Sequence, residues 1–368
     1  MSLYYVEEGK NMKKTILGLA IVLVFCSLFG AEPDFYVWQR LNSPELKQAV
    51  TEFYRSAPGK LCFLAGELEN EGTITRIAPS KEVDFSRSVP VVRIHIKNLK
   101  KKPVILAEEI CGIYAPWKSA KALEIDLDAP ESRLDYYRDL MFELRKKLKD
   151  VKLSATVLPC HLKHEKAFRA LADSCDHYVL QVHGLTHRNG KLSIYDHAEA
   201  LKAVMLAKSL KHPFKTALPL YCNRIGDKWI KPDMAKVSEL AAVCGEVIGF
   251  RLGIPGDGSS LDLKTSLRVC RGAGYSPKLE SRWEKKSGGA WHLFIRNCGF
   301  FAEKVTLRLN FKEAPEDMDT FNRARLDGNN KLTLILPPSG TEKPCLWVRT
   351  GRNETPSSAI EIEGENIR

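Results

Sequence analysis

The alternation of apolar and acidic residues near the middle of the chain is the clearest structural pattern in the sequence. Within residues 122–128, side chains of a strand would alternate between two faces, with Leu123, Ile125 and Leu127 on one and Glu124, Asp126 and Asp128 on the other. After Pro130, apolar residues recur every three or four positions and predict an amphipathic helix over residues 131–150. Carboxylates therefore crowd the end of a strand, where burial is costly unless they are paired or used in chemistry.

The same order of strand and helix repeats along the chain. Strands are predicted at 34–40, 61–68, 89–96, 122–128, 152–159, 177–184, 215–221 and 247–253. Helices are predicted between and after them, at 44–57, 104–114, 131–150, 163–175, 196–210, 231–242 and 262–272, with Asp196 as an N-cap. Eight strands in regular alternation with helices favour a parallel sheet, so we predict an α/β fold, a (β/α)8 TIM-type barrel over residues 32–280.

The pattern changes in the last part of the chain. Beyond residue 280, strand-like alternation continues with turn residues but without helices, which predicts a small C-terminal β-sandwich over residues 281–352. Residues 353–368 are polar and are predicted to form a flexible tail.

Strand phase also predicts which side chains enter the barrel. If the apolar faces lie beneath the helices, the interior receives a polar and aromatic set: Trp38, Glu67, Arg93, His95, Asp126, Asp128, Thr156, Gln181, His183, Tyr221 and Arg251. Most of them lie near the carboxyl ends of strands, where barrel enzymes place their sites. The structural alternative is that Arg93 and Arg251 simply neutralise the acids.

The N-terminal segment predicts export. Residues 12–31 contain two lysines, an apolar run and small residues around Gly30 and Ala31, the order found in a secretory signal peptide. Residues 1–11 are then an upstream extension, and the mature protein is expected in the periplasm or outside the cell. An uncleaved anchor stays open as an alternative, and contact with a membrane is expected only through this segment.

Charge and cysteine content limit the partners. The net charge is +11, but the lysine runs at 97–102 and 145–149 lack interleaved aromatic residues, so we expect solvated faces and no nucleic-acid partner. A polymeric partner would more easily be anionic than basic. The sequence shows no zinc-ligand spacing, and no metal or other cofactor is expected; Cys298 and Cys345 are the one candidate disulfide.

Five ordered segments carry a resemblance to a known family. DFYVWQR, LEIDLDAPESRLDYY, LSATVLP, HYVLQVHGL and HPFKTALPLY, between residues 34 and 221, resemble the bacterial family of domains of unknown function numbered 3142. The resemblance implies an exported barrel related to those of glycoside hydrolases. It implies no particular activity.

The residue types in the predicted interior suit glycoside hydrolysis. That reaction uses two carboxyl groups flanking the bond, about 5–5.5 Å apart for retention or about 6.5–9.5 Å for inversion. We predict Asp128 and Glu67 as the catalytic pair, with Asp126 shifting a neighbour's pKa by like-charge repulsion. Trp38 and Tyr221 are predicted to stack on sugar rings. The predicted hydrogen-bonding residues for the substrate are His95, Gln181, His183 and Arg251.

Three alternatives remain at this point. Chitinase-like barrels carry Asp-x-Asp-x-Glu on this strand, and Pro130 stands where the glutamate is required, so their substrate-assisted mechanism is not supported. Metal-dependent hydrolysis would draw on His95, Asp126, Asp128 and His183, without a ligand spacing that favours it. A non-catalytic glycan-binding or envelope-assembly protein would keep the barrel but lock its acids in arginine pairs beneath a closed mouth.

Overall fold

A computed structural model describes residues 32–363, apart from short gaps at 189, 227, 256, 300, 302, 312–314, 323, 328–330, 337–342 and 351–357. The predicted signal peptide and upstream extension, residues 1–31, lie outside the described residues. Among the helices that are described, none is both long and apolar enough to cross a membrane.

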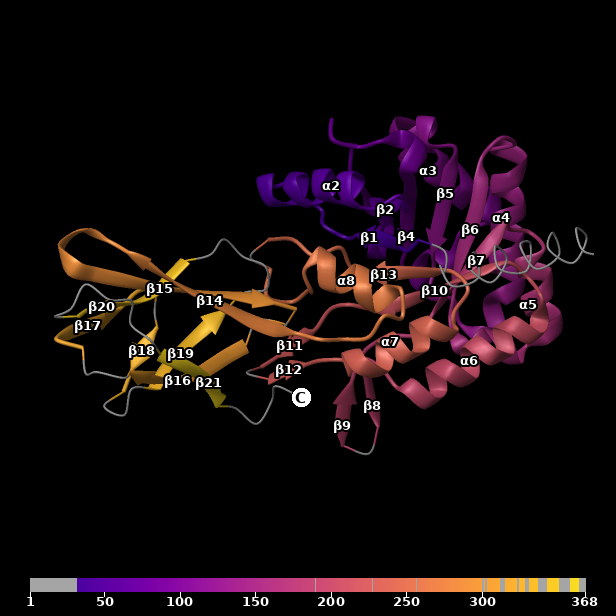
Figure 1. The fold of residues 1–368 in the computed structure, drawn as a ribbon. Helices are drawn as coiled ribbons and strands as arrows, with labels where there is room; N and C mark the ends of the chain where they lie inside the picture. Colours follow the sequence, from indigo (N-terminus) through magenta and orange to yellow (C-terminus); the bar gives the residue numbers. More distant parts are fainter. Residues whose placement is uncertain are drawn as a thin grey trace, which may run out of the picture.

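Eight parallel strands form a closed barrel, as the sequence predicted (Figure 1). They are β1 (Asp34–Val37), β2 (Leu61–Leu68), β4 (Ser88–Ile94), β5 (Ala122–Asp126), β6 (Lys152–Val157), β7 (His177–Gln181), β10 (Phe214–Pro219) and β13 (Val247–Phe250). Around the barrel their order is β1, β13, β10, β7, β6, β5, β4 and β2. The ring closes because β1 pairs with both β13 and β2.

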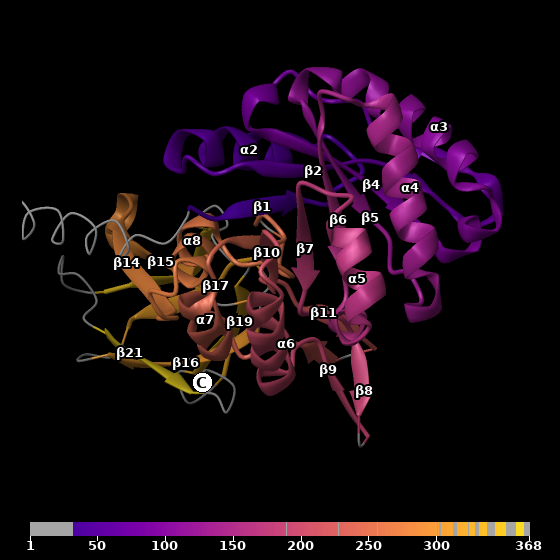
Figure 2. The same cartoon turned by 90° about the vertical axis from the view of Figure 1, so that its right-hand side faces the viewer.

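Helices follow the strands and cover the outside of the barrel (Figure 2). They are α2 (Pro44–Ser56), α3 (Pro103–Tyr114), α4 (Leu134–Lys147), α5 (Glu165–Ala172), α6 (His197–Leu210), α7 (Met234–Val243) and α8 (Leu263–Cys270). Asp196 caps α6 by accepting a hydrogen bond from the amide of Glu199, which confirms that predicted cap. Asp233 and Asp262 cap α7 and α8 in the same way.

The phase of β5 is as the sequence predicted. Leu123 and Ile125 are fully buried in the core between strands and helices, together with Tyr137 of α4. The phenol of Tyr137 donates a hydrogen bond of 2.7 Å to the carbonyl of Ile125 and so ties the helix to the strand. The acidic face of β5 is consequently turned into the barrel.

The barrel interior is closed below that acidic face. A small apolar layer crosses it at mid-height, made by Tyr36, Cys62, Val91, Val179, Ala217 and Ile248. At the amino ends of the strands, Lys215 forms an ion pair with Asp34 at 2.6 Å. Among the described residues, side chains therefore fill the interior from its amino end up to the level of Tyr36.

Two short hairpins extend the connections after β7 and β10, and the sequence patterns did not predict them. The first pairs β8 (Thr186–Arg188) with β9 (Lys191–Ser193), and the second pairs β11 (Asn223–Ile225) with β12 (Lys228–Ile230). A further short strand, β3 (Ile74–Arg76), runs antiparallel to the end of β2. Both hairpins follow the carboxyl ends of their strands and so rise from the same end of the barrel (Figure 2).

The C-terminal part is a small β-sandwich, as predicted. One sheet contains β14 (Lys278–Lys285), β15 (Ala290–Cys298), β20 (Lys343–Arg349) and β17 (Asp317–Thr320); the other contains β18 (Arg325–Leu326), β19 (Lys331–Leu336), β16 (Glu303–Phe311) and β21 (Ser358–Glu363). Apolar side chains of both sheets, including Leu293, Leu332 and Leu346, form a core separate from that of the barrel.

Two features of this part differ from what the sequence led us to expect. Within the segment predicted as a flexible tail, residues 358–363 form β21, which pairs antiparallel with β16. Cys298 and Cys345 are both free thiols. The strand register sets Cys298 opposite Lys278, whereas the Cys345 thiol lies 3.3 Å from the carbonyl of Leu293, so the two cysteines do not face one another.

Candidate active site

A pocket of about 200 Å³ lies at the carboxyl ends of the barrel strands. Its lining residues are Tyr36, Trp38, Arg93, Asp126, Asp128, Thr156, Gln181, His183, Tyr221 and Phe250. Eight of the eleven side chains that strand phase assigned to the interior are in this lining. The structure brings together residues from seven strands or the turns after them, which lie far apart in the sequence.

One side of the pocket is aromatic. Trp38 packs edge-on against Tyr36 with ring centroids 5.7 Å apart, and Phe250 lies within 5.3 Å of Trp38. Phe250 also contacts the rings of Tyr221 and His183, at 5.2 and 5.1 Å. These residues come from β1, β13, β10 and β7 or directly follow them, and those four strands are consecutive around the barrel. The aromatic wall thus extends continuously along four of the eight barrel strands.

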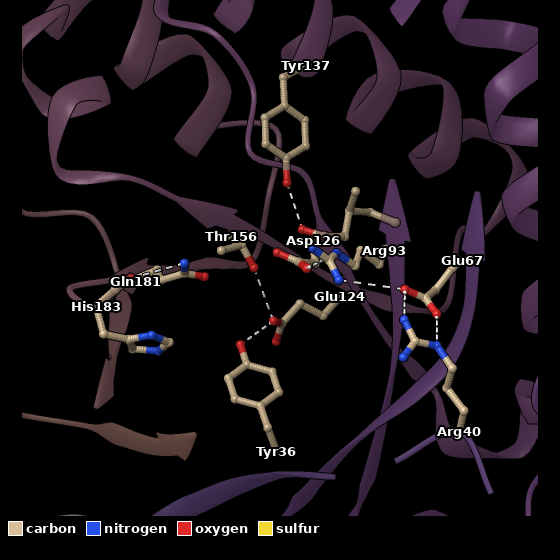
Figure 3. A network of polar contacts seen from close by, with 11 residues as sticks. Tyr36, Arg40, Glu67, Arg93, Glu124, Asp126, Tyr137, Thr156, Gln181 and His183 are labelled. Carbon is tan, nitrogen blue, oxygen red and sulfur yellow. Dashed lines mark hydrogen bonds and ion pairs between the residues drawn. The ribbon is translucent and has the colours of Figure 1, made fainter. Parts of the chain in front are cut away.

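The opposite side of the pocket is charged (Figure 3). Asp126 ends β5, and its side chain keeps 14% of its surface exposed; Asp128, two residues further, is solvent-exposed. The Arg93 guanidinium of β4 lies 3.8 Å from the Asp126 carboxylate. Burial, together with the neighbouring charge of Asp128, raises the pKa of Asp126 to about 7. Asp126 is therefore divided between its protonated and ionised forms near neutral pH.

Glu124 forms the floor beneath Asp126. Its side chain is only 1% exposed, it accepts a hydrogen bond from the phenol of Tyr36, and the hydroxyl of Thr156 donates to the same carboxyl oxygen at 3.3 Å. Burial raises the pKa of Glu124 to about 7. Figure 3 shows that both partners are hydroxyl groups, and neither carries charge to offset ionisation. Glu124 was absent from the predicted site although it lies on the same acidic face as Asp126.

Glu67 is buried outside the pocket lining and is held by arginines. Its carboxylate accepts hydrogen bonds from Arg40 Nε at 2.5 Å and Arg40 Nη2 at 2.9 Å, and Arg93 approaches it at 3.7 Å. The paired register of β2 with β4 sets Glu67 directly beside Arg93, which favours this ion pair. The structure therefore places Glu67 outside the pocket lining, paired with two arginines, and does not bring it together with Asp128 in the pocket.

His95 and Arg251 also lie outside the pocket lining. Strand β4 ends at Ile94, so His95 starts the short helical turn Ile96–Lys100 and its Nδ1 accepts from the amide of Lys97 at 3.3 Å. On β13 the side chains of Ile248 and Phe250 point into the barrel. Arg251 is one residue further along, so strand alternation turns its side chain to the opposite face. Arg251 instead forms an ion pair with Asp257 at 2.8 Å and donates to Ser259. Their predicted contact with a substrate in this pocket is therefore not supported.

Tyr36 and Phe250 are pocket residues that the sequence prediction missed. Tyr36 is two positions before Trp38, and the two-residue period of a strand could have identified it. Phe250 was missed because the phase of β13 was assigned one residue out, and a shift of one residue exchanges the two faces of a strand.

His183 links the two walls of the pocket. Its Nδ1 lies 3.4 Å from the Tyr221 hydroxyl, and its backbone carbonyl accepts from Gln181 Nε2 at 3.2 Å. Its Nε2 is buried and has no hydrogen-bond partner among the described residues. Burial lowers the pKa of His183 to about 3, so the ring is neutral. A neutral imidazole with one open nitrogen offers a single hydrogen bond to a small polar ligand.

The described residues contain no group of three or more His, Cys, Asp or Glu side chains arranged to hold a metal ion. His95 is separated from the pocket, so the four residues of the metal alternative are not brought together.

These features define a (β/α)8 barrel with a polar pocket at the carboxyl ends of its strands. The model of the family described as "Domain of unknown function (DUF3142)" matches residues 87–241, within the part of the chain that carries the resemblance. The family resemblance read from the sequence is thus confirmed. No curated protein matches the chain.

Several solved glycoside-hydrolase structures are similar in general fold. A chitinase from Rhizomucor miehei has 12% identity and a TM-score of 0.45, with 65% of this chain and 99% of that one covered. A putative chitinase A from Streptomyces coelicolor has 10% identity and a TM-score of 0.41, covering 61% and 92%. A putative alpha-galactosidase/melibiase from Bacteroides fragilis has 9% identity and a TM-score of 0.41, covering 88% and 79%. Function must therefore be argued from the residues of this chain.

Proposed function

We propose that this protein is a glycoside hydrolase that cleaves a polysaccharide or cell-envelope glycan by carboxylate acid/base chemistry. The observation that carries the proposal is the division of the pocket into an aromatic wall and an acidic wall. A sugar ring has the same division, since its C–H groups form apolar faces and its hydroxyls form a polar edge. Such a ring can pack against Trp38 while its hydroxyls reach Asp126, Gln181 and His183.

Asp126 and Asp128 replace Asp128 and Glu67 as the proposed catalytic pair. Alternate residues of an extended segment have Cα atoms about 6–7 Å apart, a spacing that suits two carboxyl groups acting on one glycosidic bond. Asp126 has a pKa of about 7 and can hold a proton at neutral pH for the leaving oxygen. Asp128 is solvent-exposed and is assigned to activate water or attack the sugar.

The experiment is a screen of the mature chain against a panel of polysaccharides, with released reducing ends as the readout. On any substrate that is cleaved, Asp128→Asn should abolish turnover and leave binding intact. Asp139→Asn, at a solvent-exposed position on α4, serves as the matched control and should behave as wild type. Unchanged turnover in Asp128→Asn would remove Asp128 from the mechanism.

A non-catalytic glycan-binding protein is the second candidate, and one observation favours it. The pocket volume of about 200 Å³ is below the roughly 300–1,000 Å³ of most ligand sites, so it accommodates little more than one sugar ring. Under this function, calorimetry would detect glycan binding that Asp126→Asn and Asp128→Asn do not weaken, while no panel member releases reducing ends.

Export to the periplasm or the cell exterior is part of the proposal and is supported by the signal-like sequence of residues 12–31. Edman sequencing of the protein recovered outside the cytoplasm should then begin near residue 31 or 32. A start at residue 1 or 12 in that fraction would contradict cleavage.

A further inference from the structure

The two hairpins beyond β7 and β10 continue the wall of the pocket. His183 lies just before the β8–β9 hairpin, and Tyr221 lies just before β11, so each hairpin starts from a pocket residue. The side chains of His183 and Tyr221 contact each other, with 3.4 Å between Nδ1 and the hydroxyl. Strands β7 and β10 are also hydrogen-bonded neighbours in the barrel. A ligand leaving the pocket on this side would therefore run onto the hairpins.

The hairpins present exposed apolar side chains at this position. Leu185 precedes β8, Ile225 ends β11 and Trp229 lies in β12, and all three are solvent-exposed, with Trp229 at 37%. In the β11–β12 ladder, Trp229 is directly opposite Arg224. Directly opposite residues of an antiparallel pair share a face, so the side chains of Trp229 and Arg224 lie on the same face of the hairpin. An indole ring is a suitable surface for the C–H face of a sugar.

The hairpin segments are also basic in sequence. The side chains described in these segments include the exposed basic residues Lys191 and Arg224 and the partly buried Lys231. His187 is also exposed. Positive charge concentrated at one rim of a pocket attracts polyanions and raises their rate of encounter.

We propose that the two hairpins form a binding surface for an acidic polysaccharide, which passes from the pocket across Trp229 and the basic residues of β9 and β11. This inference rests on the proposed function and specifies its substrate class: a glycan bearing carboxylate or sulfate groups. A neutral sugar ring of that chain occupies the pocket beside Asp126, and its acidic groups lie further along, on the hairpins. A nucleic acid is less suited because every nucleotide that approached the pocket would bring its phosphate towards Asp126 and Asp128.

The test measures binding rather than turnover, on the full mature chain carrying Asp128→Asn. The probes are two matched pairs of polymers: dextran sulfate with dextran, and hyaluronan with hyaluronan whose carboxyl groups have been reduced to alcohols. We expect the charged member of at least one pair to bind more tightly than its neutral partner. Trp229→Ala combined with Lys191→Ala and Arg224→Ala should weaken that binding by roughly tenfold or more and reduce its dependence on salt.

Control variants separate the hairpins from the general basic charge of the protein. Phe142→Ala removes an exposed aromatic side chain from α4, and Lys149→Ala with Lys166→Ala removes two exposed charges elsewhere on the barrel. These controls should bind as the parent does. Equal losses in the control and hairpin variants would overturn the proposal, as would failure of both acidic polymers to bind or displacement of either by substoichiometric single-stranded DNA.

The binding surface and the proposed enzymatic activity can fail independently, and different results would contradict each of them. Binding of an acidic polymer through the hairpins without release of reducing ends by the wild type would contradict the enzymatic function and leave this surface in place. Cleavage of a neutral glycan by a protein that does not bind either polyanion would support the enzyme and overturn the surface.

Discussion

Glu67 and Asp126 lie on either side of the same arginine, Arg93, but their carboxyl groups differ in how fully they are paired with cations. Arg93 lies 3.7 Å from Glu67 and 3.8 Å from Asp126. Glu67 also receives two hydrogen bonds from Arg40, and its side chain is only 6% exposed. In the described part of the chain no second cation is paired with Asp126, and burial, together with the neighbouring Asp128, raises its pKa to about 7.

The difference shows that position in a barrel interior is not enough to make a carboxyl reactive. A carboxylate fixed by a bidentate arginine has its lone pairs occupied by hydrogen bonds and is not available to a substrate. A carboxyl that is buried beside another acid exchanges its proton near neutral pH, which acid/base catalysis requires. In the proposed function, Glu67 therefore has a structural role and Asp126 a catalytic one.

The largest expected effect is on turnover. Asp126→Asn should lower kcat on a cleaved glycan by about 10³-fold, because an amide cannot donate the proton that acid catalysis adds to the leaving oxygen. Glu67→Gln should change kcat by less than about tenfold, since Glu67 is outside the pocket lining. Initial rates of reducing-end release measure both. Equal losses in the two variants would abolish the distinction between these acids.

The next effect concerns stability against pH. The pKa of Glu124 is about 7 in the folded protein against an ordinary value of 4.5. A raised carboxyl pKa means that folding binds a proton, so its stabilising contribution is full below about pH 4.5 and is lost as the pH rises through about 7. The loss is on the order of 3 kcal/mol, because each pKa unit corresponds to about 1.4 kcal/mol.

Glu124→Gln should remove that part of the pH dependence, since a glutamine can still accept from Tyr36 and cannot ionise. Urea unfolding at pH 5 and pH 8 measures it, and the free energy of unfolding of the variant should fall less between the two pH values. Glu199→Gln, at an exposed position on α6, is the matched control. A variant with the same pH dependence as wild type would show that Glu124 does not change its protonation in this range.

A smaller effect concerns folding stability, where Glu67→Gln should be the more damaging of the two substitutions. Glu67→Gln removes the charge that pairs with Arg40 and Arg93 and should lower the free energy of unfolding by about 2 kcal/mol at pH 7. Asp126→Asn relieves a buried carboxyl of its unfavourable ionisation and should leave stability unchanged or higher at pH 8. Urea unfolding again provides the measurement, and a less stable Asp126→Asn at pH 8 would contradict it.

The smallest expected effect concerns the aromatic wall. Trp38→Ala should weaken binding of a glycan to the Asp128→Asn protein by about tenfold, which is the usual cost of removing one aromatic contact of roughly 1.4 kcal/mol. Trp38→Phe keeps a ring against Tyr36 and should restore much of the affinity. Isothermal titration calorimetry gives the affinities, and unfolding curves show whether each variant is folded. Full affinity in Trp38→Ala would remove the stacking role.

The sequence by itself determined the eight-stranded barrel, the sandwich after it and the acidic face of β5. Those features depend on local periodicity, because a two-residue alternation gives a strand and a spacing of three or four gives a helix. For the same reason, alternation placed Asp126, Asp128, Thr156, Gln181 and His183 correctly in one pocket. The same alternation gave a wrong result on β13, where the strand phase was assigned with a shift of one residue. Phe250 therefore occupies the position in the pocket that was expected for Arg251.

Only the tertiary structure decided which acids are paired and which are not. Arg40 is in the turn after β1 and Glu67 is near the end of β2, and no local spacing links them. The proton affinities of Glu124 and Asp126 likewise depend on burial and on charges from neighbouring strands, which exist only when the ring is closed. Periodicity is a property of consecutive residues, whereas electrostatics depends on distances across the barrel, and those distances are set by folding.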